Sequence, residues 1–316
     1  MVPKPVALPR PRRVEAAAAA PAEGLVDARS RMKDMLRRRE ALAYELELHD
    51  AEIERLAIES ICGDTDDTQD VELYDGTLGV DRQFVDDHER PVGQLQWLDD
   101  LSRRFNRPGD SPGNVAGVRW GSGALIAEDM FLTAGHCFDR FGGGWQRPQR
   151  DGVTVQSDEI ARLMRINFNY QIDGTTQSVR PGDPFPVEEL LEYRLGGLDF
   201  AIIRAGRNQA GQQPGDVYGH YGLSPSDLTI QGAMLCLIQH PAGRPKRIEA
   251  GPLHQNLAGR ISYDSLDTQG GSSGSLILDD TGKVVGVHTN GGCSRFSGAN
   301  FGVAIGVVRN ASSVIP

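Results

Sequence analysis

The 316-residue chain lacks any run of about 20 apolar residues, and it has few aromatic residues. Without such a run the sequence predicts no transmembrane helix. Aromatic side chains make up 6% of the residues and hydrophobic ones 39%, which indicates polar segments outside the core. The formal net charge is -10, which argues against a general nucleic-acid-binding protein. We therefore expect neither a membrane span nor a nucleic-acid partner.

A convincing secretion signal is also lacking. Residues 16–20 are a weak apolar stretch preceded by Glu15, and no leucine-rich segment follows the basic residues near the N-terminus. Arg12 and Arg13 form a poor twin-arginine signal because an acidic residue lies close by. We expect a cytoplasmic protein, or one secreted by a non-classical route.

Cysteine is scarce, with only Cys62, Cys137, Cys236 and Cys293. Four cysteines allow three pairings, and the sequence does not choose among them. Buried free thiols in a reducing compartment are the favoured interpretation. No cysteine or histidine pair has zinc-ligand spacing, and we interpret the acidic run 64–67 as a solvated turn rather than a calcium site. The sequence thus predicts no metal and no cofactor.

Composition divides the chain into three regions. Residues 1–24 are rich in Pro, Ala and Arg and are predicted to be disordered. Residues 25–60 have apolar side chains every three or four positions, which predicts a long amphipathic helix with Asp27 as a possible N-cap. From residue 61 to 316, short apolar runs alternate with Gly, Pro and Asp turns, which is typical of a β-sandwich or barrel. Examples of expected strands are residues 92–97, 115–126, 234–238 and 301–308.

Three distant segments carry the residues of an activated hydroxyl nucleophile. Residues 268–275 place Ser273 among glycines, in a turn that would expose its side chain. His136 follows a short apolar strand, and Asp199 begins another. A serine, a base and a carboxylate that orients the base are the parts that such chemistry needs. Asp173 and Asp183 compete for the carboxylate role but lie in loops rich in Gly and Pro.

The same glycine-rich segment also fits the G-x-S-x-G nucleophile elbow, with Ser272 as the nucleophile. An elbow needs a helix after the serine, and its Asp and His must follow in the chain. Here the order is His, Asp, Ser, and an Asp/Gly turn between residues 276–278 and 284–288 predicts a β-hairpin. Ser273 is therefore preferred to both Ser272 and Ser275.

These segments resemble the three active-site segments of trypsin-like serine proteases, over roughly residues 92–308. The glutamyl endopeptidases are the most similar branch, because of Thr268, of Gly270-Gly271 and of residues 286–292 and 296–301. The resemblance implies two six-stranded antiparallel β-barrels with the triad between them, preceded here by the long N-terminal helix. It also implies a serine endopeptidase that acts on proteins or peptides.

The resemblance assigns further roles around the triad. Backbone N–H groups of Gly271 and Ser273 would form the oxyanion hole. Residues at the positions of Thr268 and His288 would contact an acidic side chain of the substrate, although His288 could instead be an ordinary core histidine. Thr289 would pair with an extended substrate through its backbone, and Gly291 would keep the pocket edge open. We therefore expect cleavage after Glu, with Asp weaker.

Two questions stay open at the level of sequence. Ser272 stands where many trypsin-like zymogens have an aspartate, so activation through that residue is absent. Residues 1–60 could be a pro-segment whose removal near Ser60–Ile61 supplies an amine to the pocket, or a permanent module for self-association or a partner helix.

A catalytically idle protease fold that only binds other proteins through this helix is the alternative function.

Overall fold

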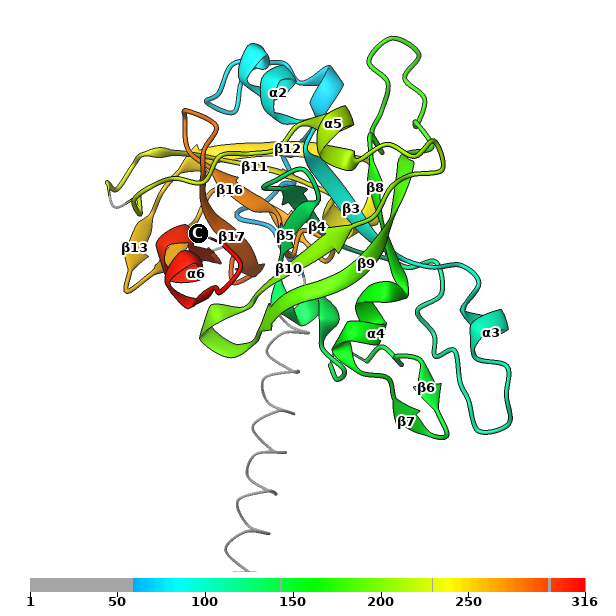
Figure 1. The fold of residues 1–316 in the computed structure, drawn as a ribbon. Helices are drawn as coiled ribbons and strands as arrows, with labels where there is room; N and C mark the ends of the chain where they lie inside the picture. The colour runs from blue at the N-terminus through cyan, green and yellow to red at the C-terminus, as the bar shows by residue number, and fades with distance from the viewer. Residues whose placement is uncertain (1–58, 143, 229, 295–296, 316) are drawn as a thin grey trace, which may run out of the picture. The chain divides into compact units, whose positions relative to one another are not determined.

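Antiparallel strands form most of the structure, a computed structural model that describes residues 59–142, 144–228, 230–294 and 297–315 (Figure 1). The predictions for residues 1–24, and for residues 25–58 of the expected helix, lie outside the described residues. The described residues form two β-lobes, drawn from cyan to green and from yellow to red in Figure 1.

The first lobe is a closed barrel with the strand order β10-β5-β4-β3-β8-β9. Its strands are β3 (Val92–Trp97), β4 (Arg119–Leu125), β5 (Met130–Thr133), β8 (Met164–Phe168), β9 (Asp183–Arg194) and β10 (Phe200–Ala205). Alternate side chains point inward and build an apolar core that includes Leu95, Phe131 and Ile166, none of them exposed. The expected first six-stranded barrel is confirmed.

The second lobe differs from the expected second barrel because it is an open eight-stranded sheet, ordered β13-β14-β18-β17-β16-β11-β12-β2. Its strands are β2 (Gln69–Asp70), β11 (Met234–Gln239), β12 (Arg247–Pro252), β13 (Gln255–Leu257), β14 (Arg260–Tyr263), β16 (Leu276–Leu278), β17 (Val284–Asn290) and β18 (Asn300–Ala304). The outer edge of β12 pairs with β2, at Arg247 and Ile248, so that edge does not pair with β13 or β14. Residues 59–89, here called the N-terminal segment, thus supply the strand at one edge of this sheet.

Short helices and strands fill the connections between the sheets. They are β1 (Glu59–Ser60), η1 (Val71–Leu73), α2 (Arg82–His88), α3 (Leu101–Arg104), η2 (Gly135–Phe138), β6 (Gln149–Arg150), β7 (Val153–Thr154), α4 (Ser157–Arg162), η3 (Gly196–Leu198), α5 (Pro214–Tyr218), η4 (Pro241–Gly243), β15 (Thr268–Gln269) and α6 (Ile305–Ala311). Helix α2 begins where the Asp81 carboxylate accepts a hydrogen bond from the backbone N–H of Phe84, and it buries Val85.

Two element boundaries differ from the sequence predictions. The strand expected over residues 301–308 ends at Ala304, and helix α6 follows (Figure 1). Ile305 and Val308 are three positions apart, so one face of this helix buries both. At the other end of the chain, Glu59 and Ser60 form a strand against Thr268–Gln269 rather than the end of a helix.

The cysteines also correct the sequence interpretation, since not all four are free thiols. Cys62 and Cys293 form a disulfide across 231 residues of sequence, whereas Cys137 and Cys236 are buried and keep their thiols. The disulfide joins the N-terminal segment to the loop between β17 and β18.

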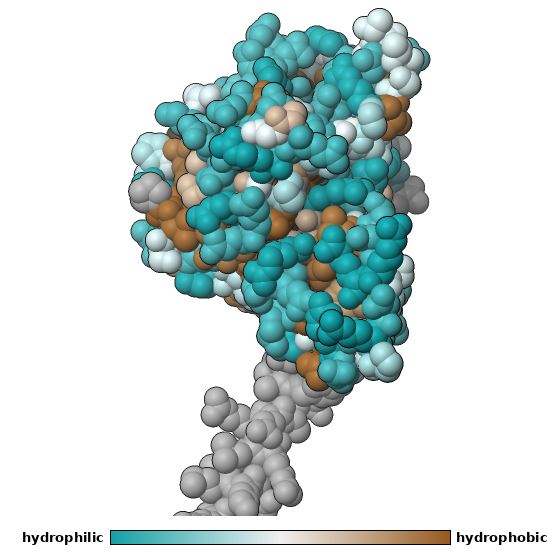
Figure 2. All heavy atoms as spheres, turned by 45° about the vertical axis from the view of Figure 1, so that its right-hand side comes forward, coloured by the Kyte–Doolittle hydropathy of each residue, from teal (hydrophilic) through white to brown (hydrophobic). Residues whose placement is uncertain are grey.

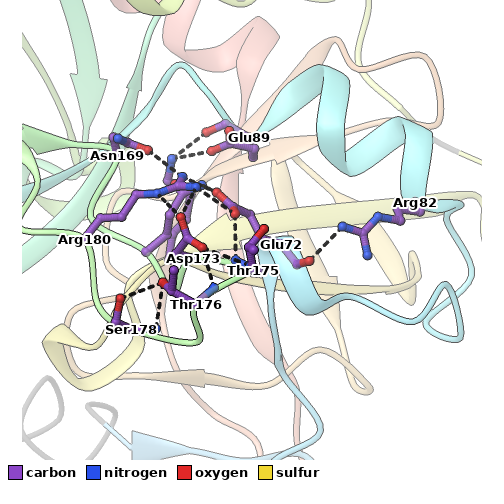
Figure 3. Close-up of polar contacts among 12 residues, drawn as sticks. Glu72, Arg82, Glu89, Asn169, Asp173, Thr175, Thr176, Ser178 and Arg180 are labelled. Atoms are coloured by element: carbon purple, nitrogen blue, oxygen red, sulfur yellow. Dashed lines mark hydrogen bonds and ion pairs between the residues drawn. The ribbon is translucent and has the colours of Figure 1, made fainter.

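Ion pairs that are at least partly buried attach the N-terminal segment to both lobes. The Glu72 carboxylate accepts hydrogen bonds from Arg180 and from the backbone N–H of Gly174, in the loop between β8 and β9. Figure 3 shows the Arg180 guanidinium between Glu72 and Asp173, to which it also donates. From Cys62 onward, the N-terminal segment is therefore a structural part of the two-lobed unit.

The fully buried Lys246 makes a second such attachment. Its ammonium donates to the Glu89 carboxylate at 2.7 Å and to the Glu89 carbonyl at 2.8 Å. Burial lowers the pKa of Lys246, and the Glu89 charge opposes that shift. A buried ammonium needs such a partner, since an uncompensated buried charge is strongly destabilising.

The surface is mostly hydrophilic on the face shown in Figure 2, with hydrophobic areas that are small and separate. Exposed large apolar residues include Phe141, Trp145, Ile230 and Leu257. No helix within the described part of the chain is long and apolar enough to cross a membrane.

The disulfide gives a direct prediction. After unfolding without reductant we expect two reactive thiols per chain, those of Cys137 and Cys236, and four after reduction. Replacing both Cys62 and Cys293 by Ser should lower the free energy of unfolding by about 2–5 kcal/mol, because the unfolded chain loses a long-range cross-link. A thiol-reactive chromophore and denaturant titration measure these values, and four reactive thiols before reduction would contradict the disulfide.

Candidate active site

The loop that carries Ser273 connects β15 to β16 and turns sharply at glycine. Gly271 has a φ of +100°, and a Cβ there would lie 2.8 Å from the backbone oxygen of His240. Only glycine fits such a conformation and such a close approach without strain. Strands β16 and β17 form a hairpin after the loop, so the hairpin prediction is confirmed and the elbow geometry does not occur.

Ser122 on β4 anchors this loop to the first barrel. Its backbone N–H donates to the Ser273 carbonyl at 2.9 Å, and its hydroxyl donates to the Gly271 carbonyl at 2.7 Å. The Ser122 hydroxyl also accepts from the backbone N–H of His240 at 2.9 Å. Ser122 is fully buried, so these bonds are shielded from water. Sequence reasoning missed this residue because a lone serine in a strand carries no signal.

The three serines of the loop have different environments. Ser272 and Ser275 are fully buried, and the Ser275 hydroxyl donates to the Ser272 carbonyl. The Ser272 hydroxyl accepts from the backbone N–H of Gln269. Ser273 is partly exposed and lines the pocket, which Ser272 and Ser275 do not. The backbone N–H groups of Gly271 and Ser273 donate no hydrogen bond to any described residue.

His136 and Asp199 are in direct contact. His136 lies in η2, directly after β5, and Asp199 lies between η3 and β10. One Asp199 oxygen accepts from the His136 backbone N–H and the other contacts Nδ1, both at 2.8 Å. The competing carboxylates are engaged elsewhere: Asp173 binds Arg180, and Asp183 accepts from the Tyr218 hydroxyl.

One pocket between the lobes collects the predicted site residues. Its volume is about 590 Å³. Apart from Asp199, which lies behind His136, every predicted site residue lines it: His136, Thr268, Gly271, Ser273, His288, Thr289 and Gly291. The fold therefore brings together segments that are up to 155 residues apart, from His136 to Gly291.

His288 on β17 is buried and held from behind by a tyrosine. Its Nδ1 forms a short hydrogen bond with the Tyr263 hydroxyl. Burial, helped by the nearby His136, lowers the pKa of His288 to about 3. The imidazole is therefore neutral at physiological pH. Tyr263 was not found from the sequence, because only the pairing of β14 and β17 with β18 brings it close to His288.

Aromatic and basic side chains form another part of the pocket wall. Trp120 and Trp145 pack edge to face at 5.6 Å, and the Arg147 guanidinium lies 4.5 Å above the Trp120 ring. Arg119 lies 3.8 Å above the ring of Tyr170. This wall offers apolar area and positive charge beside Ser273.

The family of the chain follows from a comparison with protein-family models. The model described as "Trypsin-like peptidase domain" matches residues 121–287, which is more than half of the chain. The chain belongs to this family. The trypsin-like match includes Ser122, His136, Asp199 and Ser273, the residues whose contacts build the site.

Curated relatives of this trypsin-like protein include glutamyl endopeptidases of Staphylococcus aureus. Those of strains MRSA252 and MW2 are each 24% identical over 182 residues, which is 57% of this chain and 45% and 49% of the relatives. The chain thus spans about half the length of the curated relatives it matches. Among solved structures, a Glu endopeptidase in complex with MPD has a TM-score of 0.49 at 16% identity; the match covers 79% of this chain and 99% of that chain. A serine endoprotease from Yersinia pestis has a TM-score of 0.47 at 12% identity; the match covers 72% of this chain and 63% of that chain.

The neutral His288 of this trypsin-like protein predicts a pH effect on stability. Below about pH 6.5 the unfolded chain takes up a proton on this residue, whereas the folded chain does not until about pH 3. The free energy of unfolding should therefore fall as the pH falls through this window, by up to about 1.4 kcal/mol per pH unit from this group.

Chemical unfolding of the wild type and of His288→Gln at pH 6.5 and at pH 4.5 isolates the effect, because the two proteins share every other titratable group. Between these two pH values, we expect the free energy of unfolding to fall less for the variant than for the wild type. His254→Gln is the matched control, since His254 is half exposed and pairs with Asp264 at the surface. Equal losses for His288→Gln and wild type would show that His288 is protonated in the folded state.

Proposed function

We propose that the chain is a serine endopeptidase in which Ser273 is the nucleophile, His136 the general base and Asp199 the residue that orients the base. The observation that carries the proposal is the two-point contact of Asp199 with His136, beside a pocket that is lined by Ser273 but by neither Ser272 nor Ser275. Membership of the trypsin-like family supports protein or peptide substrates.

The proposed reaction begins with attack of the Ser273 Oγ on the scissile carbonyl carbon. His136 Nε2 takes the hydroxyl proton, while Asp199 accepts the Nδ1–H and stabilises the imidazolium. The carbonyl oxygen becomes an oxyanion, to which the N–H groups of Gly271 and Ser273 would donate; loss of one such donor typically costs about 3 kcal/mol. His136 then gives its proton to the leaving amine, and water hydrolyses the acyl-enzyme by the same steps.

Covalent labelling tests the nucleophile. A fluorophosphonate probe should label the wild-type chain on Ser273, and Ser273→Ala should abolish labelling and lower kcat by at least about 10⁴-fold. Ser272→Ala is the control for the elbow interpretation and should still be labelled. Mass spectrometry of the labelled protein also shows whether residues 1–60 are still attached. No labelling of any form would favour the idle protease fold that only binds other proteins.

We further propose a preference for Glu, with Asp weaker, before the scissile bond. Thr268 and His288 both line the pocket and are nearly fully buried, so a substrate carboxylate would meet two polar groups away from bulk water. Thr289 and Gly291 line the same pocket. The backbone of Thr289 would pair with an extended substrate, and Gly291, which has no side chain, would keep the pocket edge open. The distant similarity to glutamyl endopeptidases supports the same preference.

Tyr263 would set the hydrogen-bonding state of His288 in this pocket. When the tyrosine hydroxyl donates to Nδ1, the hydrogen of the neutral imidazole must be on Nε2. That N–H would then donate to the carboxylate of the substrate. Tyr263 would thus act as a positioning residue, because it contacts His288 and does not line the pocket.

Peptides that differ only at the residue before the scissile bond test the preference. We expect kcat/KM for Glu to exceed that for Gln by at least about tenfold, because a buried donor pair discriminates charge and geometry. Tyr263→Phe should lower this ratio while labelling of Ser273 persists. Equal rates for Glu and Gln in the wild type would refute the preference and leave the endopeptidase proposal intact.

For residues 1–60 we propose removal near Ser60–Ile61, with the new amine beside the pocket. In the uncleaved chain Ser60 pairs with Thr268, which lines the pocket. Cleavage after Ser60 would therefore leave the amine of Ile61 one residue from that pair. The Ser60 hydroxyl also accepts from the Gly292 N–H and donates to the Cys293 carbonyl, so this part of the chain is fixed against the loop after β17. The competing proposal is that residues 26–60 stay attached as a permanent module for self-association or for binding a partner helix.

A further inference from the structure

Three carboxylates from distant parts of the sequence meet beside the pocket. Asp67 lies in the N-terminal segment, Glu249 on β12, and Asp267 directly before Thr268. One oxygen of each lies within 4.8 Å of those of the other two. Of the acidic run 64–67, which the sequence suggested is a solvated turn, only Asp67 belongs to this group.

Two of these carboxylates are buried without a cationic partner. Glu249 is 0% exposed and Asp267 1% exposed, while Asp67 faces solvent. Among the described residues, none of the three forms an ion pair with a lysine or arginine. Like charges this close and this poorly solvated repel one another, and a bound cation would relieve that repulsion.

Glu249 provides an independent observation that points to a ligand. Its Oε2 is fully buried and has no hydrogen-bond partner among the described residues. Buried carboxylate oxygens are rarely left without one.

We propose that Asp67, Glu249 and Asp267 form a calcium-binding site. The donors are all oxygens, which suit a hard divalent cation. Calcium accepts six to eight oxygen ligands in flexible geometry, and the exposed side at Asp67 admits the waters that would complete the shell. Magnesium generally uses fewer protein carboxylates and keeps more of its water.

The position of the site gives the cation a structural role. Both Asp267 oxygens accept backbone hydrogen bonds, from the N–H of Cys62 at 2.6 Å and of Asp67 at 3.1 Å. Calcium would therefore connect the N-terminal segment, next to its disulfide, with β12 and with the loop between β14 and β15 that leads to Thr268. The proposal does not depend on peptidase activity.

Titration of the metal-free full chain with calcium tests the site. Calorimetry measures the binding, and thermal unfolding measures the change in Tm. We expect one ion per chain, and a rise in Tm of about 5 °C or more at a calcium concentration a hundredfold above Kd. Glu249→Gln should weaken binding more than tenfold and abolish the rise, because it removes the buried charge and preserves the side-chain volume. Asp67→Asn, at an exposed position, should also lower the affinity.

Glu159→Gln is the matched control, because Glu159 pairs with Arg150 in the first lobe, and it should keep the full rise in Tm. In the absence of calcium, Glu249→Gln should be at least as stable as the wild type. No calcium binding to the wild type, or an unchanged rise in Glu249→Gln, would overturn the proposal. An equal rise with magnesium alone would overturn the assignment to calcium.

Discussion

The close contact between β4 and the loop of Ser273 is the constraint on which the site depends. Ser122 donates to the carbonyls of Gly271 and Ser273, so it holds a loop of the second lobe against a strand of the first. Gly274 makes this approach possible, since a Cβ there would lie 2.1 Å from the Thr133 hydroxyl and 2.4 Å from the Ser122 carbonyl. With the two lobes fixed in this way, Ser273 and His136 line one pocket.

The N-terminal segment is the other structural element that positions the pocket. It adds β2 to the edge of β12 and forms the disulfide with Cys293, and in the uncleaved chain it also pairs Ser60 with Thr268. Glu72 attaches it to Arg180 of the first lobe. These contacts link the two lobes through one short stretch of chain, so the pocket wall at Thr268 is supported from behind.

Local sequence patterns predicted the strands before His136 and after Asp199, and the hairpin after Ser273. Each depends on residues within about ten positions, where apolar runs and turn residues decide the outcome. Patterns failed where distant backbone competes. The edge of β12 pairs with β2, and the second sheet is an open one rather than a six-stranded barrel. Residues 305–311 form a helix because one face packs on the core.

The sequence by itself determined which residues could form the site, since His136, Asp199 and Ser273 stand in recognisable local segments. Only the tertiary structure decided the Cys62–Cys293 pair, the neutral state of His288 and the meeting of Asp67, Glu249 and Asp267. The physical reason is distance along the chain. Pairing, burial and charge compensation depend on groups that are many residues apart, and no local pattern records which of them become neighbours.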